Sequence, residues 1–368
     1  MICFEAIGGG NVAIDAIVPT ASGWASAGDL VIGDEVFDER GRIARVRRAS
    51  LVEEGEPRYR LVFRDGTAII ASASQVWPLR EFSGGYADRS VTTADVFSAG
   101  ITFERRLTSG KTKASRGGVA RWRTLATPAL SVDDCPLPLS PYLLGYWLGD
   151  GDSDGPRITV SEDDLPDLER QLDLEGTRII SRQRTHGRTF RVRFDLGGYA
   201  TGVRALRELG VLGNKHIPCT VFRASRRQRL EILQGLVDSD GYIENRTNRV
   251  EICFTAARLA QDTVQLIRTL GLYPRMNSVD AVLKGRRVGI RHRINFTAYQ
   301  DDAVSRLPRK LGRLSAKGLI APYSRIRTIV GVALVDPGPA FGIEVDSPSG
   351  LYLAGEGMIP VGPTSTRG

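Results

Sequence analysis

The chain has 368 residues, too many for one ordinary hydrophobic core, so we expect at least two domains. Hydrophobic residues make up 42% and charged residues 25%, which is typical of a globular protein rather than a disordered or membrane-embedded one. No apolar run approaches the roughly 18 to 20 residues of a membrane span, which predicts no membrane contact and a cytoplasmic location, in the cytosol or nucleoid of a bacterial or phage-infected cell. The four cysteines and three histidines stand apart, which argues against a disulfide scaffold or a zinc site.

The positive charge is concentrated in one region. The net charge is +8 and the isoelectric point is about 9.5. Residues 215–325 contain 21 Lys and Arg against 9 Asp and Glu, so the rest of the chain is slightly acidic. Such a concentration indicates a polyanionic partner such as double-stranded DNA, and a solvated basic face is the alternative.

In chain order, residues from Ala13 to about Leu79 are predicted to form short strands separated by turns, with Asp65-Gly66 as a hairpin turn. The polar stretch Ser83 to Arg123 is rich in Gly, Ser, Lys and Arg, and predicts a long loop. Within residues 83–130 this loop is either a mobile surface insertion or a basic DNA-contacting arm.

Strands are predicted again near the end, at 326–334, 341–345 and 351–354. Residues 1–135 and 326–368 are therefore expected to form one all-β domain. A different domain, residues 136–325, interrupts it.

The middle domain contains an internal repeat: residues 143–151 (LLGYWLGDG) are echoed by residues 233–241 (LQGLVDSDG). Small residues four positions apart, Gly145 with Gly149 and Gly235 with Ser239, give each predicted helix a face that allows close packing.

Asp150 and Asp240 then end the two helices on the same side, each followed by a glycine suited to a left-handed C-terminal cap. Mg²⁺ prefers oxygen ligands, so we expect two or three Mg²⁺ ions to be shared by the two carboxylates. The preceding residues, Gly149 and Ser239, are included among the candidate metal ligands.

The two nonapeptides resemble the paired motifs of LAGLIDADG homing endonucleases of the single-chain, intein-associated kind, over roughly residues 141–325. The first copy departs at Leu148, where the family has Asp, but both copies keep the carboxylate at the eighth position. The resemblance implies an α+β fold with a duplicated αββαββα arrangement and a monomer that carries both half-sites. It also implies Mg²⁺-dependent cleavage of both strands of a long DNA site across the minor groove, with short 3′ overhangs.

The family also places a lysine upstream of the second motif in a Lys-x-Ile-Pro segment, which Lys215 to Pro218 matches. Lys310 is the best candidate for its counterpart after the second motif. The resemblance implies that Lys215 and Lys310 are catalytic, by stabilising phosphate charge or perturbing a water molecule. Surface or phosphate-contacting lysines without a catalytic role are the alternative.

Two strand-like segments are candidates for base recognition, because alternation places their polar residues on one face. These residues are Arg191 and Arg193 in the first half and Arg291, Arg293 and Asn295 in the second. Lys284, Arg286 and Arg287, in the adjoining turn, are expected to hold phosphates. A solvated sheet face is the alternative.

The flanking β segments resemble the Hint fold of inteins: residues 15–36 the first block, 72–77 the second and 341–360 the last. The residues that splicing requires are missing. The region around Ala13 has no nucleophile, Gln75 replaces the block-two histidine, and Gly362-Pro363 replaces the terminal His-Asn pair.

Some inteins splice without the first nucleophile, using a tryptophan, a late cysteine and a near-terminal threonine. Here Trp77 is kept, but Gly342 and Val361 occupy the other two positions. We therefore expect a free-standing, site-specific endonuclease descended from an intein, with splicing lost. A splicing-competent intein and a DNA-binding module without cleavage are the alternatives.

Overall fold

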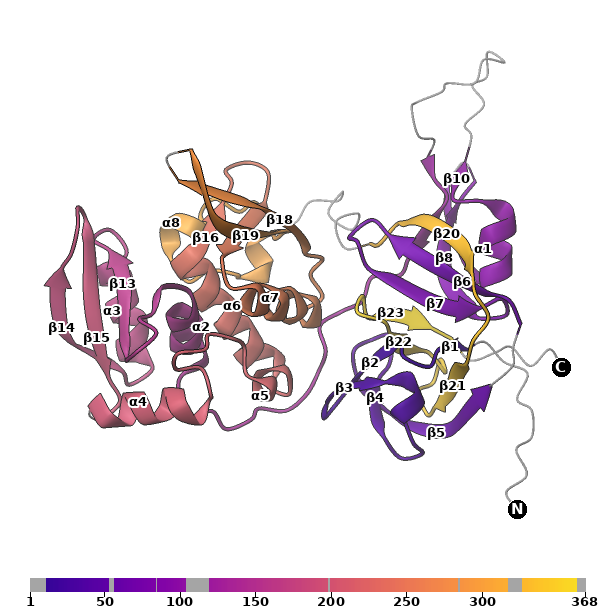
Figure 1. The fold of residues 1–368 in the computed structure, drawn as a ribbon, viewed down its shortest axis with the longest axis horizontal. Coiled ribbons are helices and arrows are strands. Elements are labelled where there is room, and N and C mark those ends of the chain that lie inside the picture. Colours follow the sequence, from indigo (N-terminus) through magenta and orange to yellow (C-terminus); the bar gives the residue numbers. More distant parts are fainter. Residues whose placement is uncertain are drawn as a thin grey trace, which may run out of the picture. The chain divides into compact units, whose positions relative to one another are not determined.

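The chain divides into two compact units, described by a computed structural model over residues 11–52, 56–83, 85–103, 119–197, 199–283, 285–316 and 326–362 (Figure 1). The β unit comprises residues 1–131 and 322–368, and the α/β unit residues 132–321. The predicted boundaries, at 135/136 and 325/326, lie close to these. Within the described residues, no helix is long and apolar enough to cross a membrane.

The β unit is built on a nine-stranded sheet with the strand order β20-β6-β7-β1-β21-β5-β4-β2-β3. Its two chain segments interleave, because Val12 of β1 pairs with Ala71 of β7 on one side and Phe341 of β21 on the other. One hydrophobic core therefore contains residues from both ends of the chain.

The elements of the β unit have these bounds: β1 (Val12–Ala13), β2 (Ile17–Thr20), β3 (Gly23–Ser26), η1 (Ala27–Asp29), β4 (Glu35–Phe37), β5 (Ile43–Val52), β6 (Arg58–Phe63), β7 (Ala68–Ser72), β8 (Val76–Phe82), β9 (Tyr86–Thr92), α1 (Thr93–Ala99), β10 (Thr102–Phe103), β11 (Val119–Ala120), β12 (Trp122–Thr124), β20 (Ile329–Val335), β21 (Ala340–Val345), β22 (Tyr352–Ala354) and β23 (Ile359–Val361). The predicted hairpin turn is confirmed: Asp65-Gly66 joins β6 to β7, and Gly66 has a φ of 90°.

The prediction of one long loop over Ser83 to Arg123 is wrong for most of the described residues of that stretch. Strand β9 pairs with β8, and α1 follows with a capping box in which Thr92 and Asp95 bond each other's backbone N–H groups. Arg121 pairs with Glu81 at 3.0 Å inside this structure. Residues 104–118 of the proposed basic arm, which carry five of its eight Lys and Arg, are not among the described residues.

The α/β unit contains two successive halves. The first has α2 (Pro141–Asp150), β13 (Arg157–Ser161), α3 (Leu165–Leu174), β14 (Arg178–Arg184), β15 (Thr189–Asp195) and α4 (Tyr199–Glu208). After the short α5 (Cys219–Phe222), the second has α6 (Arg226–Asp240), β16 (Gly241–Ile243), β17 (Arg249–Phe254), α7 (Ala257–Thr269), β18 (Arg275–Leu283), β19 (Arg286–Thr297), η2 (Gln300–Asp302) and α8 (Pro308–Leu311).

The two halves differ from the predicted αββαββα order in one respect. The second half has that order, but in the first half the strand after α2 is reduced to a single bridge between Gly151 and Ile158. Asp154, Gly155 and Pro156 favour a turn, and proline has no backbone N–H for a strand ladder, which explains the shortening. The sheets are β13-β15-β14 and β16-β17-β19-β18.

Candidate active site

Helices α2 and α6 lie side by side in the middle of the α/β unit (Figure 1). A methyl group added to Gly145 would lie 2.1 Å from the backbone oxygen of Ile232, and one added to Gly235 would lie 2.2 Å from that of Tyr142. The helices therefore touch backbone to backbone, which only glycine permits. The small-residue spacing predicted close packing, and the geometry agrees with it.

The same packing brings the two helix ends together. A methyl group on Gly149 would lie 2.0 Å from Ser239 Oγ and 3.1 Å from Asp240 Oδ2, so the end of α2 contacts the end of α6. Asp150 and Asp240 are the last residues of the two helices. The paired carboxylates thus occupy adjacent helix ends.

The glycines after the carboxylates do not form left-handed caps as predicted. Gly151 has a φ of −79° and Gly241 a φ of −83°, both in the extended region. They are required for space: an added Cβ would lie 2.3 Å from the Trp147 oxygen at Gly151 and 2.5 Å from the Val237 oxygen at Gly241. The chain leaves each helix by folding back tightly against its last turn.

The electrostatics of the helix ends favour a cation. Partial burial, then the charge of Asp240, raises the pKa of Asp150 to about 6, while Lys215 and Lys310 oppose the shift. The Asp240 side chain is more exposed, but the surrounding protein still removes enough water to raise its pKa. Both carboxylates also sit at helix C-termini, which carry partial negative charge.

Two lysines lie near the carboxylates, as predicted from the motif. Lys215 Nζ donates to the oxygen of Gly149 at 3.0 Å and lies 5.2 Å from the centre of the Trp147 ring. Lys310 is 5% exposed and donates to the oxygens of Val237, Asp238 and Gly241 at 2.7 to 2.8 Å. Burial lowers the pKa of Lys215 and brings that of Lys310 to about 8.

The residues present fit a divalent cation only in part. Within the described residues, no group of three or more His, Cys, Asp and Glu side chains is placed to hold a metal ion. The Gly149 oxygen accepts from Lys215, and the Ser239 hydroxyl donates to the oxygens of Gly235 and Leu236 in its own helix. A cation here would depend on Asp150, Asp240 and oxygens from its substrate and water.

A buried polar cluster behind the carboxylates was not predicted. Asp238 is 1% exposed and accepts hydrogen bonds from the Tyr142 hydroxyl and the Arg306 amide, each at 2.9 Å, and from Ser305. Arg306 in turn donates to Gln234 at 2.7 Å and pairs with Glu175. The signal was present in the sequence, since Asp238 is the sixth letter of the second motif, where the first copy has Leu148.

The predicted base-reading residues lie on the exposed faces of the two sheets. In β15, Arg191 and Arg193 alternate with the buried Val192 and Phe194. Asp152 pairs with Arg191 at 3.4 Å, so this face carries its own counter-charge.

In β19, Arg291, Arg293 and Asn295 alternate with buried Ile294 and Phe296. Glu251 of β17 pairs with Arg293 at 3.1 Å, and Asn295 accepts a hydrogen bond from Arg249 at 2.8 Å.

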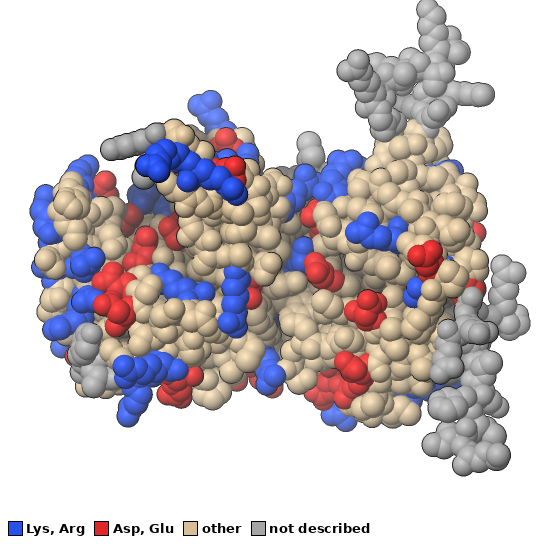
Figure 2. Space-filling view, in the orientation of Figure 1, with Lys and Arg blue, Asp and Glu red and all other residues tan. Residues whose placement is uncertain are grey.

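The predicted phosphate-binding turn is shorter than expected. Arg286 and Arg287 belong to β19, and Arg287 pairs with Asp280 of β18 at 2.9 Å; Lys284 lies outside the described residues. Basic side chains cover the β18–β19 hairpin and the outer edge formed by β14 and β15 (Figure 2). The excess charge of residues 215–325 is thus displayed on the β18–β19 hairpin, and β14 and β15 add basic side chains from outside that range.

Three of the predicted splicing positions, Gln75, Val361 and Gly362, lie together at the turn between β7 and β8. Gln75 is fully buried, and its Nε2 donates to the Gly362 oxygen at 3.0 Å, next to Val361 at the end of β23. Trp77 is also buried and donates to Thr93 Oγ1 at 2.8 Å. Gln75 thus lies against the last described residue of the unit, Gly362.

The start of the unit differs from the prediction. Asn11, rather than Ala13, lies at this turn, because its N–H donates to Ser72 Oγ at 2.9 Å. Ala13 is inside β1 and pairs with Ala340, while Gly342 is in β21 and pairs with Ser50. Pro363 lies outside the described residues.

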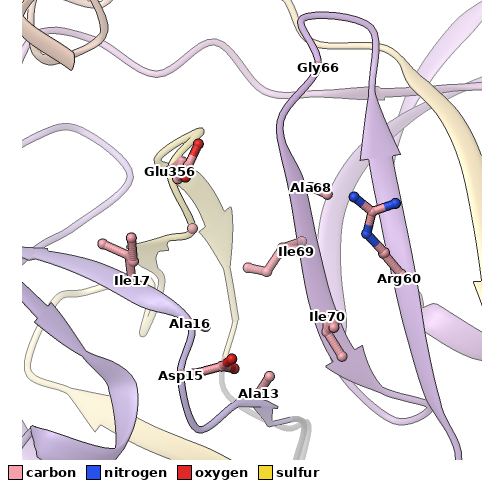
Figure 3. A pocket seen from close by; sticks show the side chains of 11 residues that line it. Ala13, Asp15, Ala16, Ile17, Arg60, Gly66, Ala68, Ile69, Ile70 and Glu356 are labelled. Atoms are coloured by element: carbon pink, nitrogen blue, oxygen red, sulfur yellow. The ribbon is translucent and has the colours of Figure 1, made fainter. Parts of the chain in front are cut away.

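A pocket of about 390 Å³ also lies in the β unit, between β2, β6 and β7. Ile17 and Ile69 lie on opposite sides of it, with Asp15 and Glu356 near its rim (Figure 3). It contains none of the predicted site residues except Ala13. The carboxylate pair belongs to the other unit and is not part of this pocket.

Comparisons with known proteins find a homing endonuclease family for part of the α/β unit. Residues 216–308 match the family model of homing endonucleases. The chain is 32% identical over 365 residues to a replicative DNA helicase DnaB of Mycobacterium intracellulare, covering 96% of this chain and 58% of that protein. The chain thus spans little more than half of this relative.

Two further matches cover smaller shares of the chain. An iron-sulfur cluster assembly SufBD family protein of Mycobacterium leprae (strain TN) is 30% identical over 142 residues, covering 36% of this chain and 16% of that protein. The crystal structure of the Msm DnaB1 intein splicing domain bound with zinc is 36% identical, covering 23% of this chain and 61% of that chain, with a TM-score of 0.20.

Proposed function

We propose that the α/β unit is a LAGLIDADG-type homing endonuclease that makes a double-strand break at a long, specific DNA site. The observation that carries the proposal is the pair Asp150 and Asp240, held at adjacent helix ends by backbone contact of Gly145 and Gly235. The match of residues 216–308 to homing endonucleases supports it. Both half-sites are on one chain, so we propose that it acts as a monomer, in the compartment that holds the host DNA.

The residues present can divide the work of phosphodiester hydrolysis. Mg²⁺ bound between the carboxylates would supply Lewis-acid activation of water and of the phosphate. Asp150 and Asp240 hold the negative charge that attracts the ion, and Lys215 offers its ammonium to a phosphate oxygen. The exposed strands β15 and β19 present Arg191, Arg293 and their neighbours to the bases. We propose that the products carry short 3′ overhangs.

We further propose that the β unit is a Hint-like remnant of an intein that no longer splices. Similarity to parts of two differently named proteins, a helicase and a SufBD family protein, is what an inserted element would produce. At its centre Gln75 holds the Gly362 carbonyl, but an amide cannot transfer protons as an imidazole does. A chain flanked by two foreign tags should therefore yield no ligated tags, and their appearance on a gel would restore the splicing alternative.

The endonuclease is tested with a randomised plasmid library in Mg²⁺, using the wild-type chain and Asp150→Asn/Asp240→Asn. Sequencing of the cut ends should reveal one family of sites with short 3′ overhangs for the wild type and none for the variant. Identical cuts with both proteins would indicate a contaminating nuclease. Tight DNA binding without cuts, at a library depth that covers long sites, would favour a binding module.

A further inference from the structure

We infer that the two half-sites are unequal: Lys215 is available to a scissile phosphate, whereas Lys310 closes the end of α6, so the two DNA strands are cut in a fixed order through a nicked intermediate. The inference rests on the proposed endonuclease function. It concerns a property that the two-fold repeat of the sequence does not suggest.

Lys310 has no hydrogen bond left to offer. An ammonium has three N–H donors, and those of Lys310 are directed to the oxygens of Val237, Asp238 and Gly241. These oxygens lie at the C-terminal end of α6 and in the residue that follows it, where carbonyls run short of helix partners; that of Val237 also accepts from the Gly241 N–H. Lys310 therefore acts as a buried cap, and its withdrawal would remove one hydrogen-bond donor from each of the three oxygens.

The segment that carries Lys310 is anchored on both sides. Arg309 binds the Asp164 carboxylate through two hydrogen bonds, which ties α8 to the first half of the unit. Upstream, Ser305 and the Arg306 amide bind Asp238, which is itself buried in α6. Movement of Lys310 toward DNA would require these contacts to break together.

Lys215 is held much more loosely. Its ammonium makes one hydrogen bond to a described residue, at 3.0 Å to Gly149, and lies over the Trp147 ring. The charges of Asp150, Asp152 and Asp240 also act on it. The neighbouring backbone is fixed instead, since the Ile217 amide donates to Asp262 at 3.0 Å. Lys215 thus combines a fixed backbone with a half-buried ammonium. This combination suits a side chain that turns toward a phosphate when DNA binds.

The asymmetry originates in the motif itself. Asp238 anchors the Lys310 segment, and the corresponding residue of α2 is Leu148, which is fully buried and has no polar atom in its side chain. The first copy thus cannot anchor the segment of Lys215 in the same way. The replacement of Asp by Leu148 in the first motif therefore accounts for the looser attachment of Lys215.

In each strand the reaction adds water across a phosphodiester P–O bond: the hydroxyl oxygen bonds to phosphorus, and a proton goes to the leaving oxygen. A free ammonium stabilises the charge that develops on these oxygens. Only the strand whose phosphate lies beside Lys215 receives this stabilisation. That strand should be cut first.

The experiment uses a supercoiled plasmid with the site found in the library, and a linear duplex with a different dye on each strand. Wild type should accumulate nicked circles and cut one strand at least about fivefold faster. Lys215→Met should slow that strand about 100-fold without changing the melting temperature, and Lys215→Arg should recover part of the rate. Lys310→Met should lower the melting temperature yet keep the strand order below it.

Asp164→Asn provides a second test of the anchor, should Lys310→Met fail to fold. It should lower the melting temperature and leave the strand order unchanged. Equal cutting of both strands by the wild type, or loss of one cut in Lys310→Met at an unchanged melting temperature, would overturn the inference. If the wild type cuts neither strand of any site, the endonuclease function itself fails; equal cutting of both strands refutes only the fixed order.

Discussion

Replacing Asp150 by Asn should abolish cleavage and at the same time stabilise the metal-free protein. The folded state raises the pKa of Asp150 from 3.8 to about 6, so it favours the protonated carboxyl. Stability from this group is present at low pH and is lost as pH rises from about 4 through 6. A shift of this size corresponds to about 3 kcal/mol at pH 8. Asparagine resembles the neutral form, and we expect about 2 kcal/mol of gain, or roughly 5 °C.

Thermal unfolding of the full chain in EDTA measures this, with Asp301→Asn as the charge-matched control, because Asp301 is exposed on the surface of the same unit. The gain of Asp150→Asn over wild type should shrink by about half at pH 5, where the wild-type carboxyl is largely protonated. Added Mg²⁺ should stabilise the wild type and not the variant. A variant that is less stable than wild type at pH 8, or a gain independent of pH, would refute the electrostatic reasoning.

Three further outcomes follow from the same geometry. Gly235→Ala should destabilise the chain by about 3 kcal/mol in urea unfolding, because the new methyl group would lie 2.2 Å from a backbone atom. Gly85→Ala is the control and should change the stability little, because the space around Gly85 is open. Equal effects of the two substitutions would contradict backbone contact of the helices. Tyr142→Phe should cost about 1 to 2 kcal/mol, since buried Asp238 loses one donor, and an unchanged urea midpoint would mean that this bond contributes nothing. Arg191→Ala and Arg293→Ala should each weaken DNA binding. If these residues contact phosphates, the salt dependence of binding should fall by about one counterion, and if they contact bases, the base preference should change. Arg40→Ala, on the β unit, is the control, and no effect of either kind would remove β15 and β19 from the DNA interface.

The carboxylates and the helix contact were predictable because the repeat places the same small residues and the same Asp at equal spacing in two helices. The cause of the closing glycines was not predictable. Helix-end glycine usually signals a left-handed residue, and only the three-dimensional path shows that Gly151 and Gly241 instead make room for a tight reversal. The sequence pattern correctly indicated a glycine after each helix, but the structure shows a different reason for it.

The stretch after Ser83 shows the opposite failure. Its many polar residues concealed β9 and the capping box of Thr92 and Asp95, since β9 is an edge strand without a buried residue and therefore has the composition of a loop. Long-range pairing was equally hidden: β1 fits between β7 and β21, whose residues are far apart in the sequence. The local sequence of a strand cannot predict which strands pair with it, because the pairing depends equally on the sequence of the partner.

The arrangement of charge explains why the active site is also a weak point of the fold. Two helices end side by side, and each adds the partial negative charge of its C-terminus to a carboxylate. Burial first, and then the charge of Asp240, raises the pKa of Asp150 despite the opposing charges of Lys215 and Lys310. A divalent cation bound there would relieve the repulsion, and the two basic sheets would bring phosphates to the same place. The energy that the folded state loses by holding these carboxylates together would therefore be recovered on binding a metal ion and DNA, which would couple the stability of the unit to its proposed reaction.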